Sequence, residues 1–386
     1  MNGRERTLAA FRGERPDRVP VFEKTVSSGF ASRVLGREAH TGMGALHRAE
    51  VESWLRGGEE AHEEFVETLH SDLLALIRAL EFDVLRLPWR FRRRPGRKLS
   101  EFDYEFGEPG RAGHCVMRYS PGSDTFSSIT SGRGDSADMD ALEQAVESQR
   151  SRQLAEADRP PDADVFKWVR WARQSAPDLA LATSHGFISI PPHESWLMAT
   201  ALRPDLVEIR LDMYVEEFLR DLPLLKEIGV DFLLAGGDFA SNAGPVYSPQ
   251  VFHDLLLPRL RKIVDAAHQA GMPYVFCTDG VVWPVADDLF VASGVDGYGE
   301  IDVAAGMDLL EVREKYPELV LVGGVECGEL LTNGTPEAIY AEARRVVEGL
   351  KPGGRHILGS SNSVNHLVPP ENYRAILRAG REFGVY

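Results

Sequence analysis

The chain of 386 residues has few of the features that mark secreted or membrane proteins. It contains only three cysteines, Cys115, Cys277 and Cys327, which are too few for a disulfide framework and suit a reducing compartment. No apolar run reaches the roughly 18 residues that a transmembrane helix needs, and the N-terminal segment is charged throughout. These absences predict a cytoplasmic protein without a membrane span or a signal peptide.

Positive charge is also scarce. Forty-three Lys and Arg residues stand against 59 Asp and Glu residues, which gives a formal net charge of -16. A surface of this sign repels nucleic acid and anionic membranes, so we expect neither as a partner. The densest basic run, from Arg92 to Lys98, is expected to be a solvated loop.

Short β-rich apolar runs are present along the chain, and from about Asp205 onward they alternate with amphipathic helical stretches. This alternation is typical of βα units around a parallel sheet. The rival is an open doubly wound sheet, but no glycine-rich phosphate loop follows the first strand, so we predict a (β/α)8 TIM-type barrel. The expected strands are Val19–Phe22, Phe82–Leu87, Leu179–Ser184, Val230–Ala235, Tyr274–Cys277, Val295–Tyr298, Leu319–Val322 and His356–Leu358.

Several helices have clear boundaries in the sequence. Gly3–Gly13 and Ala45–Leu80 are predicted to be helical. Ser248–Gly271 has a Ser-Pro start and a glycine end, and Pro258 inside it predicts a kink or break. A helix is also expected from the Thr-Pro-Glu start at 335 to about Leu350.

The N-terminal half contains an elaboration of the barrel. Glu101–Gly122 alternates aromatic and polar residues between turn glycines, which predicts a β-meander. Asp135–Pro160 is polar and helix-prone and is expected to cross the surface. The Arg-Gly-Asp triplet at Arg133–Asp135 is attributed to chance. We therefore predict one domain, 1–386, with an insertion at about 91–160.

Polar residues follow the apolar runs at the points where catalytic groups of such barrels lie, the carboxyl ends of the strands. A single strand-end carboxylate is more often a helix cap than a catalyst, but five strand ends of this kind favour a site at one mouth. The general acid or base candidates are Asp238, Asp279 and Glu326. The substrate-binding candidates are His185, Glu300, Asn362 and Arg86.

Two of the cysteines, Cys277 and Cys327, also lie at strand ends. Two thiolates with a histidine or carboxylate would form a zinc site of catalytic type. A lone buried thiol at such a position is common and chemically inert, and this structural interpretation is the preferred one. His253 and His268 lie on an expected helix and are predicted to be surface residues.

Five segments together form a recognisable pattern: RERTLAAFRGERPDRVPVF, LLAGGDFASNAGPVYSPQVFHDLLLPRLRKIV, FCTDG, VGGVECGELLTNGTPEAI and ILGSSNSVNHLVPPENYRAIL. The pattern resembles the superfamily that contains uroporphyrinogen decarboxylase and the corrinoid-linked methyltransferases. The resemblance covers nearly the whole chain. It implies a (β/α)-barrel with catalysis at the barrel mouth and no permanently bound organic cofactor.

The chain departs from the superfamily at its ligand positions. The zinc-dependent methyltransferases have a His-x-Cys pair where this chain has Cys277-Thr278-Asp279, and a later cysteine where it has Asn362. A different zinc set, Cys277 with Glu326 or Cys327, is an alternative expectation. The decarboxylases have an arginine-rich stretch after the first strand, where this chain has VFEKTVSSGF with Lys24 as its only cation.

The expected function is transfer of a methyl group from a small O-, S- or N-methyl compound to a corrinoid. The chain lacks the Asp-x-His-x-x-Gly pattern of cobalamin-binding modules, so the corrinoid is expected on a partner protein. One alternative is a decarboxylase of a tetrapyrrole or small carboxylic acid. Another is a non-catalytic, ligand-binding barrel. The chain could also pair as a homodimer.

Overall fold

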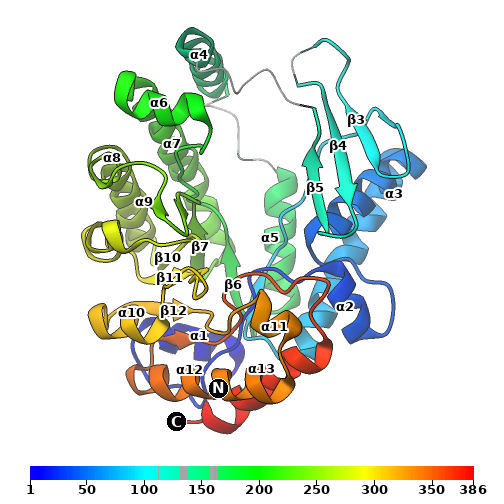
Figure 1. The fold of residues 1–386 in the computed structure, drawn as a ribbon. Helices are drawn as coiled ribbons and strands as arrows, with labels where there is room; N and C mark the ends of the chain where they lie inside the picture. Colours follow the sequence, from blue (N-terminus) through cyan, green and yellow to red (C-terminus); the bar gives the residue numbers. More distant parts are fainter. Residues whose placement is uncertain (112, 131–137, 157–160, 162) are drawn as a thin grey trace.

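The centre of the protein is a curled parallel sheet of seven strands in the order β1-β6-β7-β10-β11-β12-β13. The computed structural model describes residues 1–111, 113–130, 138–156, 161 and 163–386 (Figure 1). Each strand lies within or overlaps a predicted run. The strands are β1 (Val84–Arg86), β6 (Ala180–Thr183), β7 (Phe232–Gly236), β10 (Tyr274–Cys277), β11 (Gly297–Gly299), β12 (Val320–Val322) and β13 (His356–Ile357).

The predicted first strand, Val19–Phe22, is not a regular strand in the structure. Val21 forms one isolated parallel bridge with Leu358, and the N–H of Phe22 donates to the Leu358 carbonyl at 2.9 Å. On its other side, the N–H of Asp83 donates to the Val21 carbonyl at 2.8 Å. Pro20 has no N–H for a ladder, which limits regular pairing here. The observed sheet therefore has seven strands, where eight were predicted.

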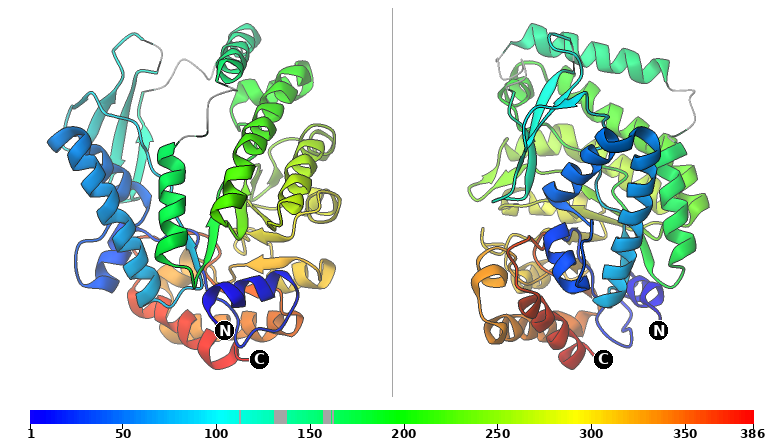
Figure 2. Two further views of the ribbon diagram at one scale, coloured as in Figure 1. Left: turned by 180° about the vertical axis from the view of Figure 1, so that it is seen from behind. Right: turned by 90° about the vertical axis from the view of Figure 1, so that its right-hand side faces the viewer.

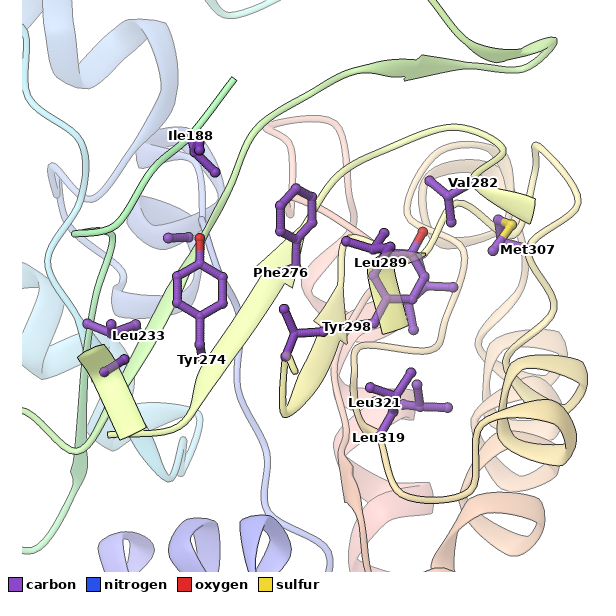
Figure 3. Close-up of a cluster of buried hydrophobic side chains, with 14 of the residues drawn as sticks. Ile188, Leu233, Tyr274, Phe276, Val282, Leu289, Tyr298, Met307, Leu319 and Leu321 are labelled. Carbon is purple, nitrogen blue, oxygen red and sulfur yellow. The ribbon is translucent and has the colours of Figure 1, made fainter. Parts of the chain in front are cut away.

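Side chains alternate between the two faces of the sheet. One face forms an inner cluster that includes Phe232, Leu234 and Val275. On the other face, Tyr274 and Tyr298 pack in the larger core cluster (Figure 3). Both faces are apolar because a parallel sheet is covered on both sides.

The helices agree with most sequence boundaries. The helix α3 (Met43–Ala79) is interrupted by non-helical backbone at Gly57 and Gly58. The helix predicted for Ser248–Gly271 is divided, as expected, at Pro258: α8 (Pro249–Val251) and a π-helical turn precede α9 (Leu257–Gln269). The other helices are α2 (Ser28–Leu35), α5 (Ala163–Ser175), α6 (Glu194–Leu202), α7 (Pro204–Ile228), α10 (Leu309–Lys315), α11 (Glu329–Asn333), α12 (Pro336–Leu350) and α13 (Pro370–Phe383).

The first helix, α1 (Gly3–Phe11), packs against the inner face of the sheet. Ala10 and Phe11 belong to the inner cluster, and the rings of Phe11 and Phe232 lie 5.0 Å apart. Arg6 of the same helix donates to Asp83 beside β1 at 2.5 Å. Both termini lie near α1 at one end of the molecule, and α4 lies at the other (Figures 1 and 2).

The insertion contains the predicted antiparallel structure. Its sheet has the order β2 (Arg97–Lys98), β3 (Asp103–Phe106), β4 (Cys115–Ser120) and β5 (Thr125–Ser128). The helix α4 (Met139–Ala155) follows in the segment predicted to be helix-prone. The Arg-Gly-Asp triplet lies outside the described residues. Within the described ranges, no helix is both long and apolar enough to cross a membrane.

Candidate active site

A cavity of about 550 Å³ opens at the carboxyl ends of β1, β6, β7, β10 and β11. A much smaller cavity of about 20 Å³ adjoins it and shares Lys24, Leu234, Cys277 and Glu300 with it. The charged or aromatic side chains of the larger cavity are Lys24, Arg86, Trp89, Phe187, Asp238 and Glu300. The structure thus brings four predicted site residues, Arg86, Asp238, Cys277 and Glu300, to one cavity. Asn362 lines the smaller cavity, and Asp279 lines neither.

The centre of this mouth contains an ion pair between Lys24 and Glu300. Glu300 follows β11 with a φ of 60°, a left-handed conformation that is uncommon for a residue other than glycine. Its side chain is only 9% exposed. Glu300 was predicted to contact substrate, and the structure shows that its carboxylate already has a cationic partner.

Asp279 and Asn362 follow β10 and β13 and are in direct contact. The Asn362 Nδ2 donates to Asp279 Oδ1 at 2.7 Å, and the Ser363 hydroxyl donates to Asn362 Oδ1 at 2.9 Å, which fixes the amide orientation. Burial and, secondarily, the negative charge of Glu300 raise the pKa of Asp279 to about 6, although the Asn362 hydrogen bond acts in the opposite direction. This carboxyl can therefore hold or release a proton near neutral pH.

Cys277 is the last residue of β10 and points into the inner cluster. Burial raises the pKa of its thiol to about 12, so it is neutral near pH 7. Its sulfur lies 2.9 Å from the position that a Cβ on Gly299 would occupy. Only glycine fits at that point of β11 without moving the thiol.

The residues of this mouth do not fit a zinc ion. In the part of the chain that the structure describes, no group of three or more His, Cys, Asp or Glu residues is placed to hold a metal. The neighbouring cations Lys24 and Arg86 would also oppose a second positive charge.

Glu326 lies at the same end of the sheet as Asp279, but its carboxylate is a helix cap. It accepts hydrogen bonds from the backbone N–H groups of Gly328 and Leu330, the latter at 2.6 Å, at the start of α11. Cys327 is half-buried against the core, and burial raises its pKa. Neither residue lines the two cavities described above. Their predicted catalytic and metal-binding roles gain no support from this placement.

Arg86 and His185 lie on the β1–β6 side of the mouth. Arg86 donates to the Ser184 hydroxyl at 2.6 Å and to the Lys24 carbonyl at 3.0 Å, and burial lowers its pKa. His185 stacks on Phe166, with ring centroids 5.4 Å apart, and burial lowers its pKa. His185 does not line the 550 Å³ cavity but a neighbouring one that it shares with Arg86.

The sequence prediction missed Glu23 and Lys24. Glu23 is buried and accepts hydrogen bonds from the Ser360 N–H at 2.6 Å, the Ser360 hydroxyl at 2.7 Å and the Tyr373 hydroxyl at 2.9 Å. Burial raises the pKa of Glu23 to about 7. The sequence did contain a signal for them. Both residues directly follow the predicted strand Val19–Phe22, just as the other candidate site residues follow predicted strands.

The two histidines predicted to be surface residues are exposed. His253 pairs with Asp288 and His268 with Asp296, at 3.0 and 2.8 Å. Their side chains are 57% and 42% exposed. They take no part in the site.

Comparison with known protein families identifies the family of this chain. The model of the family described as uroporphyrinogen decarboxylase (URO-D) matches residues 191–383, half of the chain. The chain belongs to this family. The matched part contains β7 to β13 and therefore Asp238, Asp279, Glu300 and Asn362 of the candidate site. The members of the URO-D family are enzymes.

Individual URO-D relatives are distant. A uroporphyrinogen decarboxylase of Azoarcus sp. (strain BH72) is 24% identical over 183 residues, which are 45% of this chain and 47% of that protein. The chain thus spans about half the length of the curated relative that it matches. A solved structure, a methyltransferase from Methanosarcina mazei, superposes with a TM-score of 0.64 at 21% identity over 99% of both chains. This likeness shows a shared fold along nearly the whole chain.

Proposed function

We propose that this URO-D-family protein transfers a methyl group from a small O-, S- or N-methyl compound to a corrinoid carried by a partner protein. The observation that carries the proposal is Asp279. Its carboxyl has a pKa of about 6 and is held by Asn362, a residue of the 20 Å³ cavity that adjoins the 550 Å³ cavity. Asp279 itself lines neither cavity, and the proposal places it close enough to reach a ligand there. A group of this kind can act as a general acid at the pH of a cell.

In the proposed reaction, Asp238 and Asp279 would have separate roles. The methyl donor occupies the 550 Å³ cavity, and Asp238, exposed on its wall, binds a polar atom of the donor. When the bond between the methyl carbon and its heteroatom breaks, the electron pair stays on the heteroatom. Protonated Asp279 gives its proton to that atom and so removes the negative charge of the leaving group. The acceptor supplies the nucleophile that attacks the methyl carbon.

The acceptor would be presented from outside. A complete cobalamin is larger than the 550 Å³ cavity, so the corrinoid would lie over the rim, and the rim would be the docking surface of its carrier. We also infer that segment 19–22 takes the position of the eighth strand and closes the barrel. It is hydrogen-bonded on one side to Leu358 beside β13 and on the other side to Asp83 beside β1. This closure would fix Lys24 relative to β11.

Arg86 favours a second candidate, decarboxylation of a small carboxylic acid. Among the described residues, Arg86 has no carboxylate within ion-pair distance, and it lines the cavity together with Lys24. The two cations could hold a carboxylate, and Asp279 would protonate the carbon that loses carbon dioxide. A tetrapyrrole with eight carboxylates would need more cations than this wall provides.

Cobalamin spectroscopy separates these candidates. Purified protein is mixed with chemically reduced cobalamin and, in turn, a methylated phenol, thioether or amine, and the absorbance of the reduced cobalamin is followed. Methyl transfer predicts its donor- and protein-dependent loss. Release of carbon dioxide from a carboxylated compound without cobalamin methylation would favour the second candidate. If neither occurs and Asp279→Asn binds the same ligands as the wild type, the protein is a binding protein.

A further inference from the structure

A further cavity of about 330 Å³ lies between the carboxyl ends of β1 and β6 and the helix α5. Its polar lining is formed by Arg86, Arg90, Arg92, Thr183, Ser184 and His185. No Asp or Glu is found among the described residues that line it. A wall with three arginines and no carboxylate is unexpected in a chain whose formal net charge is -16.

Two buried polar atoms of this lining have no hydrogen-bond partner among the residues that the structure describes. They are Oγ1 of Thr183 and Nδ1 of His185, and Thr183 is only 7% exposed. A buried polar atom without a partner costs free energy, and such atoms in native proteins call for an explanation. A ligand with hydrogen-bonding oxygens in the cavity would supply the missing partners.

The arginines of the cavity differ in how their charge is balanced. Arg90 is buried and donates to Glu50 Oε1 at 2.8 Å, so its charge is matched within the protein. Within the described part of the chain, Arg86 donates only to uncharged oxygens, those of Ser184 and Lys24. Arg86 therefore offers its charge to a ligand.

Arg86 also connects this cavity with the candidate active site. Arg86, Trp89 and Ser184 line both the 330 Å³ cavity and the 550 Å³ cavity. The remaining wall of the 330 Å³ cavity is apolar and includes Leu87 and Val169. One molecule could thus place an anionic group with an apolar body here and its reacting group in the 550 Å³ cavity.

We propose that the 330 Å³ cavity is an anion subsite of the active site and that the substrate is a small molecule with a carboxylate or phosphate group. Arg86 supplies the charge, and Thr183 Oγ1 and His185 Nδ1 supply hydrogen bonds to the anion's oxygens. The apolar wall holds the body of the molecule. The inference rests on the proposed function only in placing the reacting group at Asp279.

Isothermal titration calorimetry with simple probes tests the subsite. Benzoate, phenyl phosphate and uncharged benzamide are titrated into the full chain without any methyl acceptor. We expect at least one anion to bind roughly tenfold or more tightly than benzamide, because hydrogen bonds to charged groups are the stronger ones. The preference between benzoate and phenyl phosphate identifies the anion as carboxylate or phosphate.

Variants assign the binding to the cavity. Arg86→Gln is expected to weaken the preferred anion roughly 10- to 100-fold, and Thr183→Val, which keeps the side-chain shape, about 3- to 10-fold. Arg111→Gln makes the same charge change on an 80% exposed side chain outside the cavity and should bind like the wild type. Equal binding of benzamide and the anions, no binding of either anion, or wild-type affinity in both cavity variants would overturn the proposal. Since no corrinoid is present, such a failure leaves methyl transfer untouched.

Discussion

Lys24 and Glu300 form an ion pair that joins the first extended segment of the chain to the end of β11. The pair lies in the wall shared by the 550 Å³ cavity and its small neighbour. Glu300 reaches it from a left-handed backbone conformation, so the surrounding structure holds this carboxylate in place at some conformational cost. The contact therefore fixes two sides of the mouth relative to each other.

Loss of the cation should destabilise the protein. Lys24→Met leaves the Glu300 carboxylate, 9% exposed, without its partner. We expect the free energy of unfolding in urea to fall by about 1–3 kcal/mol. The double variant Lys24→Met/Glu300→Gln should recover most of the loss, and Arg111→Met, at an exposed pair with Glu108, should stay close to the wild type. Wild-type stability of Lys24→Met would show that the pair contributes nothing.

Glu23 should make stability depend on pH. Its pKa in the folded protein is about 7, above the usual 4.5, so the native state keeps a proton that the unfolded chain has released. Its contribution is fully present below about pH 4.5 and is lost as the pH rises to about 7, by up to about 3 kcal/mol. Glu23→Gln should flatten this part of the stability profile, measured by urea unfolding at several pH values. The exposed control Glu337→Gln should keep the wild-type slope, and an unchanged slope in Glu23→Gln would refute the assignment.

The Cys277 thiol should be unreactive in the folded protein. Because burial raises its pKa to about 12 and it is 4% exposed, iodoacetamide at pH 8 should leave it unmodified. The half-buried Cys115 is the internal comparison. Mass spectrometry should find Cys277 labelled only after unfolding in urea. Rapid labelling of Cys277 in the native state would mean that it is an accessible thiolate.

Glu326 should matter for stability and not for chemistry. Glu326→Ala removes the acceptor of the Gly328 and Leu330 N–H groups at the start of α11, a loss of about 0.5–2 kcal/mol for a helix cap. The rate of methyl transfer per folded molecule should remain within about threefold of the wild type. Urea unfolding and the cobalamin assay on the same preparation measure both. A large loss of rate without loss of stability would restore the catalytic role predicted from the sequence.

The sequence predicted those parts of the fold that depend on local pattern. The strand β10 occupies Tyr274–Cys277 as predicted, because a short buried β-rich run has clear ends. Helix α12 begins after its Thr335 cap. The structure of Val19–Phe22 was harder to predict. Its pairing depends on residues beside β13 and β1, which are distant in the sequence, and is limited by Pro20.

The site was predictable to the extent that strand ends determine position. Asp279 and Asn362 were both expected at the carboxyl end of the sheet, and they are hydrogen-bonded there. Which side chains pair is a matter of curvature and rotamers, so the Lys24–Glu300 contact could not be read from the sequence. The role of Glu326 as a helix cap depends on α11, a five-residue helix that the sequence pattern did not predict.

The central claim is that Asp279 protonates the leaving group, and the pH dependence of a single turnover tests it most directly. With a methyl donor that reacts in the cobalamin assay, the wild-type rate should fall about tenfold per pH unit above about pH 6, since only the protonated carboxyl can act. Asp279→Asn, which keeps a partner for Asn362, should be about 10²–10⁴-fold slower at pH 6, with little remaining pH dependence. Its free energy of unfolding at pH 8 should be no lower than that of the wild type, because the ionised carboxylate, whose pKa is raised by burial, costs stability there. A variant that retains the wild-type rate and the same pH profile would contradict the account.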